Sequence, residues 1–422
     1  MTLSVKKGFL EECDGSKVSD IELRRAIWGP FYYIAQMTGL ILHTTPEDMK
    51  TRKGLLHLIP NVLATVILLA NAVYTVVMMN GKSFSINWSY SISLMFFAIN
   101  GTVSSLVMMG YKFDNYFSNV VTLLRNATRN NFSITSFPPG IKFKFIMRTI
   151  WFTVVVISMP IYCVDNFVLY SKTVEVTEPE NVSNTDLQYF RRSMFGYQPL
   201  FCLDTIIKIY SILVSASCLL IYNCANGACC SEFSQFNVHL KEKITDKSIM
   251  KVEVVEALES QLTDFLKLIK YITESAVGSI TIGFISGVMI LITSMYAMRA
   301  FQEYLFFGIV TIGFWIATSV IFLFYSTWRV GSFHQLMMET NDFLNLSHEI
   351  QKEIQDEKIK QIFRDMIYRI NNFNYGSKNM FSVRSGTALF NLLILIIPFV
   401  SDFLVGVKYV PEFIISMTNT TS

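Results

Sequence analysis

Seven long apolar stretches set the strongest constraint on how this chain can fold. An α-helix needs about 20 mostly apolar residues to cross the hydrocarbon core of a bilayer, and it satisfies its backbone hydrogen bonds internally. Only 16% of the residues are charged, against roughly 25% in soluble domains. We therefore expect an all-α, multi-pass membrane protein. The seven predicted transmembrane helices are Leu56–Asn80, Ile86–Tyr111, Thr149–Tyr170, Phe201–Cys224, Ser279–Met298, Tyr304–Tyr325 and Thr387–Tyr409.

The segments between these spans divide the chain further. Residues 1–55 begin with a polar stretch that lacks the apolar core of a signal peptide. Within them, Ala26–His43 is apolar but interrupted by Gly29, Pro30 and Gly39. These residues favour an interfacial or re-entrant helix over an eighth span. Spans one to six occupy 56–330, a polar segment follows at 331–386, the last span is 387–410, and 411–422 form a tail.

Positive charge is distributed unevenly between the two predicted sides of the membrane. Lysine and arginine are abundant in the N-terminal segment and in the 2–3, 4–5 and 6–7 loops. The loops on the other side carry only Lys82, Lys172, Arg191, Arg192 and Arg299. Because basic loops stay in the cytoplasm, we expect a cytoplasmic N-terminus and an extracellular C-terminus. The basic loops then face acidic inner-leaflet lipids, and the net charge of +3 does not indicate a nucleic-acid partner.

The sequence contains no pattern that predicts catalysis. The orientation is opposite to that of G-protein-coupled receptors. Zinc-dependent membrane hydrolases share the orientation but need histidine ligands inside the spans, including the last one. The histidines here are His43, His57, His239, His334 and His348, and none lies in the last span. Hydrolase, protease and phosphate-loop motifs do not occur. We expect no enzyme, no metal site and no cofactor.

Two sequons lie in segments predicted to be extracellular. They are Asn181-Val-Ser183 and Asn419-Thr-Thr421, and both asparagines are predicted glycosylation sites. Cys163 and Cys202 also lie near the outer face, so a disulfide between them is possible. The odd total of seven cysteines favours free thiols.

Two long inner segments carry apolar stripes with helical spacing. Apolar residues recur at i, i+3, i+4 and i+7 through Ser248–Glu274, and again through Gln335–Ile370. A shorter run covers Phe117–Leu124. These helices either pack on each other or lie on the membrane, or they extend spans four to six into the cytosol and join subunits. The sequence leaves both interpretations open.

The last span contains two polar pairs separated by five apolar residues. Ser401-Asp402 is followed by Phe403–Val407 and then by Lys408-Tyr409. With the predicted orientation, this pattern resembles the insect odorant and gustatory receptor superfamily and its gustatory-receptor-like relatives, including those in nematodes. That family marks its last span by Thr-Tyr, five apolar residues and Gln-Phe. The spacing is kept here, while the four marked residues differ.

The resemblance implies a chemosensory receptor in the plasma membrane that acts as a ligand-gated, non-selective cation channel. Such channels are tetramers of like subunits, either homomeric or heteromeric. Their last span lines a central pore, cytosolic helices form an anchor, and each subunit binds a small molecule toward the outer half of the other spans. The alternatives are a non-conducting or metabotropic seven-span receptor and, third, a membrane enzyme or transporter.

The two charged residues of the last span, Asp402 and Lys408, would affect ion passage if they line the pore. A charge at the bilayer centre costs about 2.5–3.5 kcal/mol on insertion scales, so Asp402 is expected to face a protein interior or a water path. Either four copies of Asp402 form an acidic ring, or Asp402 bonds to another helix of its own subunit. Lys408 either snorkels outward or pairs with Asp402 or Glu412 of a neighbour. The predicted pore and gate residues are Ile394, Ile397, Val400, Ser401, Asp402, Leu404, Lys408 and Tyr409.

Aromatic and charged residues gather in the outer halves of spans two to four. They suit a pocket for a small, mostly apolar ligand, although Trp and Tyr also mark the membrane interface. Asp204 and Lys208 are four residues apart and can form a structural ion pair instead of contacting a ligand. The candidate pocket residues are Trp88, Tyr90, Phe96, Tyr162, Asp204, Lys208 and Tyr210.

Overall fold

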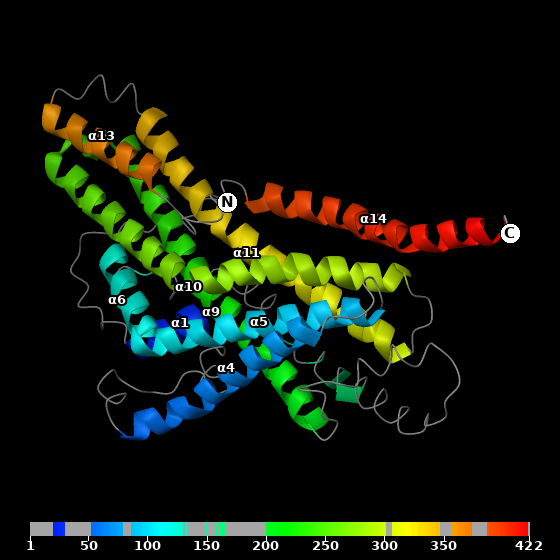
Figure 1. The fold of residues 1–422 in the computed structure, drawn as a ribbon. Coiled ribbons are helices and arrows are strands. Elements are labelled where there is room, and N and C mark those ends of the chain that lie inside the picture. The colour runs from blue at the N-terminus through cyan, green and yellow to red at the C-terminus, as the bar shows by residue number, and fades with distance from the viewer. Residues whose placement is uncertain are drawn as a thin grey trace, which may run out of the picture.

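In the residues that the computed structural model describes, all regular secondary structure is helical (Figure 1). These are 20–29, 52–78, 86–129, 132, 149, 153, 157, 160–161, 163–164, 200–300, 306–346, 356–373 and 386–420. The α-helices are α1 (Asp20–Trp28), α4 (Arg52–Met78), α5 (Ile86–Phe113), α6 (Tyr116–Thr128), α9 (Phe201–Thr245), α10 (Val252–Ala300), α11 (Phe306–Leu346), α13 (Glu357–Asn372) and α14 (Gly386–Thr420). A short 3-10 helix, Ser248–Met250, connects α9 to α10.

Three helices continue well beyond the spans predicted for them. The fourth and fifth predicted spans lie in α9 and α10, and the sixth lies in α11, which ends at Leu346. The amphipathic segment predicted at Ser248–Glu274 comprises the 3-10 helix Ser248–Met250 and, from Val252, the first half of α10, which continues into the fifth span without a break. The physical reason is that a transmembrane helix and an amphipathic helix share the same 3.6-residue geometry, so only the composition changes along the axis.

Helix α10 is the centre of the arrangement. It contacts α5, α6, α9, α11, α13 and α14. In Figure 1, α13 runs beside the first half of α10, whereas α14 runs beside its second half. The two helices that flank the segment 374–385 therefore engage opposite halves of the same long helix.

We use the name inner bundle for α6, α13 and residues 225–245, 252–276 and 333–346 of α9, α10 and α11. Its core is made by the apolar stripes that the sequence predicts. Phe265 of α10 is buried and lies edge-on to Phe233 of α9, with the ring centroids 5.2 Å apart. On α13, the buried residues are Ile359, Ile362, Phe363, Met366 and Ile370. The stripes are thus covered by helices of the same chain.

Helices α5 and α9 approach each other closely at Gly101. A Cβ atom added to Gly101 would lie 2.7 Å from the Cβ and 2.8 Å from the Cα of Ser211. The Ser211 hydroxyl donates a hydrogen bond to the carbonyl of Phe97. Small residues that allow such contacts are typical of helix pairs in membranes. Asn100, whose sequon lies in this helix, is completely buried.

Within the described residues, five helices are long and apolar enough to cross a membrane. They lie in α5, α9, α10, α11 and α14, and a shorter apolar stretch, Val62–Tyr74, lies in α4. In addition to these five helices, α4 buries Leu68 and Ala72 but exposes Leu63, Val66 and Val73. A contiguous apolar surface of this kind is typical of a helix that faces lipid. The protein is therefore a multi-pass membrane protein.

Candidate pore helix and ligand-site residues

The last predicted span is one continuous helix that extends farther than the sequence suggests. Helix α14 runs past Tyr409 and through Pro411 to Thr420, so most of the predicted tail is helical. Proline removes one backbone donor, but membrane helices tolerate this loss where other groups or water satisfy the freed carbonyl. Pro398 likewise lies inside the helix rather than at its end.

One face of α14 packs against its own chain. Ile397 forms an apolar cluster with Leu291 of α10 and Leu323 of α11. Phe390 lies edge-on to Phe324 of α11, with the ring centroids 5.6 Å apart. Ser401 is also fully buried, one turn beyond Ile397. These residues follow the spacing of one helix face.

The opposite face of α14 is apolar and uncovered by the chain. The side chains of Phe399 and Phe403 are 68% and 70% exposed, and Leu392 and Leu395 are exposed as well. An aromatic side chain left outside the protein core needs lipid or another protein surface to cover it. The face is therefore a lipid-facing or subunit-facing surface.

The structure divides the predicted pore and gate residues between these two faces. Ile397 and Ser401 lie on the buried face, whereas Ile394, Val400 and Asp402 are exposed, and Leu404 is half-buried. Lys408 and Tyr409 belong to the helical backbone of α14, but their side chains lie outside the described residues. The eight residues thus do not share one surface in this conformation.

Asp402 bonds to a helix of its own chain. Its carboxylate forms an ion pair with Arg299, which lies in the last turn of α10. The same guanidinium nitrogen, Nη1, donates to the carbonyl of Pro398 at 3.3 Å. This geometry corresponds to the second of the two interpretations of Asp402. The two partners are 103 residues apart, and in the sequence Arg299 carries only a topology signal. The only feature of the sequence that could have indicated this pair is the charge of Asp402 itself, because a charge in an apolar span needs a partner.

Three of the predicted ligand-site residues make contacts with different helices, although Phe96 and Tyr210 both pack against the main apolar core. Trp88 of α5 lies edge-on to Tyr296 of α10, with the ring centroids 6.1 Å apart. The Phe96 carbonyl accepts a hydrogen bond from Ser286 of α10. Tyr210 of α9, in contrast, packs against Leu68 of α4.

Several predicted residues lie outside the described part of the chain. The side chains of Tyr90 and Asp204, the whole of Tyr162 and the sequon asparagine Asn181 are among the residues not described, as is the side chain of Asn419. Lys208 is half-buried in α9. Cys163 and Cys202 are both free thiols, so the structure contains no disulfide between them. Among the described residues, no group of three or more His, Cys, Asp or Glu could hold a metal ion.

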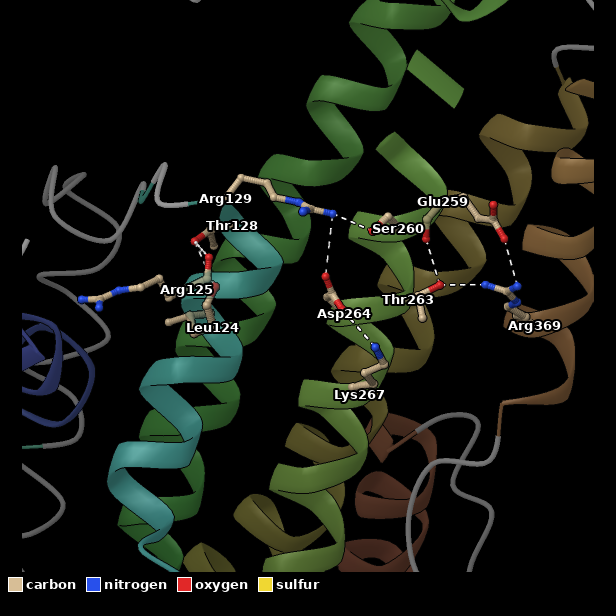
Figure 2. A network of polar contacts seen from close by, with 10 residues as sticks. All are labelled: Leu124, Arg125, Thr128, Arg129, Glu259, Ser260, Thr263, Asp264, Lys267 and Arg369. Carbon is tan, nitrogen blue, oxygen red and sulfur yellow. Dashed lines mark hydrogen bonds and ion pairs between the residues drawn. The ribbon is translucent and has the colours of Figure 1, made fainter. Parts of the chain in front are cut away.

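The inner bundle carries a polar network on two flanks of α10 (Figure 2). On one flank, Arg129 at the end of α6 donates to Ser260 at 2.7 Å and lies 3.8 Å from Asp264. On the other, Arg369 of α13 pairs with Glu259 at 2.9 Å and donates to Thr263 at 2.7 Å.

A second ion pair joins α13 to the same flank. Lys358 contacts Glu256 of α10 at 2.6 Å. This hydrogen bond raises the pKa of Lys358, because Glu256 stabilises the charged ammonium. The basic side chains of α6 and α13 thus lie on opposite sides of the acidic first half of α10 (Figure 2). The network therefore holds α13, which precedes α14, against the first half of α10.

Comparison with known proteins identifies the family and the fold. Residues 27–400 match the Caenorhabditis family of proteins of unknown function called DUF267. The chain belongs to this family. No curated protein matches it.

Solved structures of an insect olfactory receptor share the fold. The receptor OR5 from Machilis hrabei matches with a TM-score of 0.65 and 8% identity, over 91% of this chain and 98% of the receptor. The same receptor in complex with eugenol matches with a TM-score of 0.61 and 10% identity, over 92% and 99%. The predicted resemblance to the insect odorant and gustatory receptor superfamily is thus confirmed at the level of the fold, and a nematode-type relative agrees with the family.

Proposed function

We propose that this protein is a chemosensory receptor that acts as a ligand-gated, non-selective cation channel in the plasma membrane. Four like subunits, from one gene or several, surround a central pore lined by α14. The N-terminus lies in the cytoplasm and the C-terminus outside. The observation that carries the proposal is the uncovered apolar face of α14 on a fold that an insect olfactory receptor shares almost end to end.

The packing of α14 supports a position between subunits. The helix is attached to α10 and α11 along one face only, and Phe399 and Phe403 protrude from the other. If like subunits surround an axis, these residues form the contact between neighbouring subunits or the wall of the pore. A hydrophobic wall of this kind gates by dewetting. Ile394, Val400, Asp402 and Leu404 are the proposed pore residues on or beside this face, and Lys408 and Tyr409 are proposed pore residues farther along the same helix.

A small, mostly apolar ligand fits the proposal. The Machilis hrabei receptor was solved in complex with eugenol. In this chain, Trp88, Phe96 and Tyr210 supply aromatic surface between α5, α9 and their neighbours. We propose that the ligand contacts these residues, together with Tyr90, Tyr162, Asp204 and Lys208.

A non-conducting receptor is the second candidate, and one observation favours it. Arg299 neutralises Asp402 within the subunit, so Asp402 in this conformation does not present an uncompensated charge to passing cations. Such a receptor would use the same ligand site without opening a pore.

Measurements of topology, conduction and copy number test the proposal. The chain is expressed in cultured cells with an epitope after Ser422, and surface labelling of unpermeabilised cells reports the orientation. Glycosidase treatment of the Asn181→Gln and Asn419→Gln variants then shows which sequon is occupied. Whole-cell recording follows, with and without a panel of volatile phenols that includes eugenol. We expect a cation current and a purified particle with four copies. A surface-exposed protein that is monomeric and electrically silent would contradict the channel and leave the second candidate.

A further inference from the structure

We infer that Arg299 sets the position and the effective charge of Asp402, and so acts as the latch that holds α14 against α10 and fixes the ion selectivity of the pore. This inference rests on the proposed channel function and adds the regulation of its pore helix. It assigns a role to a residue outside α14 that the last-span pattern does not include.

The geometry ties two successive turns of α14 to one side chain. Arg299 Nη1 bonds both to the Asp402 carboxylate and to the Pro398 carbonyl, one turn earlier. Both contacts join α14 to the end of α10. The remaining attachment is apolar, at Ile397 and Phe390. Apolar packing already sets which face of α14 is buried, and the charged pair adds a directional restraint on the rotation of α14 about its axis.

The location of the Arg299–Asp402 pair allows it to affect ion conduction. Arg299 lies in the last turn of α10, and the predicted orientation puts this end toward the extracellular side. Both side chains are partly exposed, with 38% of Arg299 and 60% of Asp402 accessible in the single chain. The pair therefore lies at the border between the packed face and the open face of α14, where a small rotation exposes or hides the carboxylate.

The two charges have opposite consequences for permeation. While the pair is closed, the positive guanidinium cancels the carboxylate, and four subunits present no acidic ring. When α14 moves away from α10, Asp402 becomes an uncompensated anion that concentrates cations near the pore. Opening and selectivity are then linked through one contact.

A charge-swap experiment tests the latch. Arg299→Gln, Asp402→Asn, their double variant and the swap of Arg299→Asp with Asp402→Arg are compared with the wild-type chain. The readouts are current in asymmetric sodium chloride, basal or evoked by eugenol, and the melting temperature of the detergent-solubilised protein. We expect Arg299→Gln to increase the basal current and to shift the reversal potential toward that of sodium. Asp402→Asn should increase the basal current without this shift.

The double-mutant cycle gives a readout that does not depend on current. Each single variant should lower the melting temperature by about 2 °C, and the double variant by no more than either single one. The swap should restore the melting temperature and the low basal current. A matched control pair, Lys358→Gln with Glu256→Gln in the inner bundle, should change melting but not selectivity.

The possible results distinguish a failure of the Arg299 latch from a failure of the proposed channel function. A conducting wild type with additive melting shifts, and with unchanged gating in Arg299→Gln, would overturn the latch and leave the proposed function intact. A silent wild type at the cell surface would overturn the proposed function and, with it, the selectivity role of Arg299. Coupled melting in that case would show only that the ion pair forms.

Discussion

The inner bundle and α14 are both built from apolar helical sequence, yet their own chain covers them to opposite extents. Phe265 in the inner bundle is surrounded by aromatic rings from α9, and charged contacts hold its helix on two flanks. Phe403 in α14 is largely exposed. A region that is complete within one subunit can fold and hold its shape alone, whereas α14 depends on lipid or neighbouring subunits. In a channel of the proposed kind, the motion of gating would come from the less constrained region.

The first comparison makes the same substitution in the packed core and in α14. Gly101→Ala places a Cβ against the backbone of Ser211 and should cost about 3 kcal/mol or prevent folding. Gly406 has no heavy atom within 4 Å of an added Cβ. Gly406→Ala should therefore be neutral or stabilise the helix by roughly 0.5–1 kcal/mol. Melting of the solubilised protein measures both, and an equally stable Gly101→Ala would contradict the close helix contact.

A phenylalanine truncation in each region should separate folding from assembly. Phe265→Ala removes a buried ring from the inner bundle and should destabilise the subunit by about 3–5 kcal/mol. Phe403→Ala should leave subunit folding intact and weaken only the association between copies, since its ring has no cover within the chain. Particle mass and melting temperature distinguish the two results. Loss of folding in Phe403→Ala would mean that α14 belongs to the core of the subunit.

Removing one ion pair should loosen α13 without unfolding the bundle. Arg369→Gln breaks contacts to Glu259 and Thr263, and partly exposed pairs of this kind contribute about 1 kcal/mol or less. We expect faster amide hydrogen exchange in residues 357–372 and unchanged exchange in α6. Arg364→Gln, on the exposed side of the same helix, is the matched control. Equal exchange in both variants would show that apolar packing alone holds α13.

The smallest effect is that of pH on the inner bundle. The pKa of Lys358 is raised by its hydrogen bond to Glu256, so this stabilisation is present below the usual lysine value and is lost as the pH rises through the raised value. The pKa of Glu357 is lowered by its hydrogen bond to Lys360, so that stabilisation is lost only in acid.

Burial lowers the pKa of His239 in the same bundle, so stability also declines as the pH falls below the usual His value. Melting temperature should therefore stay nearly constant only between about pH 7 and pH 9, given the usual values near 6.5 for His and 10.4 for Lys. Lys358→Gln should remove the decline of melting temperature in alkali and leave the decline in acid. A pronounced transition of the inner bundle between about pH 7 and pH 9 would point to another titrating group.

Much of the fold could be predicted because it depends on one-dimensional patterns. The apolar runs predict the helices α4, α5, α9, α10, α11 and α14, and the 3.6-residue stripes predict which residues of α10 and α13 are buried. Both signals follow from the length of a bilayer and the geometry of a helix, so they need no knowledge of neighbours. The last-span spacing led to the receptor fold in the same way.

The partner of each functional side chain was decided only by the tertiary structure. A helical pattern shows that α14 has two faces, but the positions of α10 and α11 determine that Ile397 and Ser401 are the buried ones. The pairing of Asp402 with Arg299 joins residues 103 positions apart, and Trp88 and Tyr210 pack in different contacts. Local sequence determines helices because their hydrogen bonds are local, whereas side-chain partners depend on how distant helices are placed together.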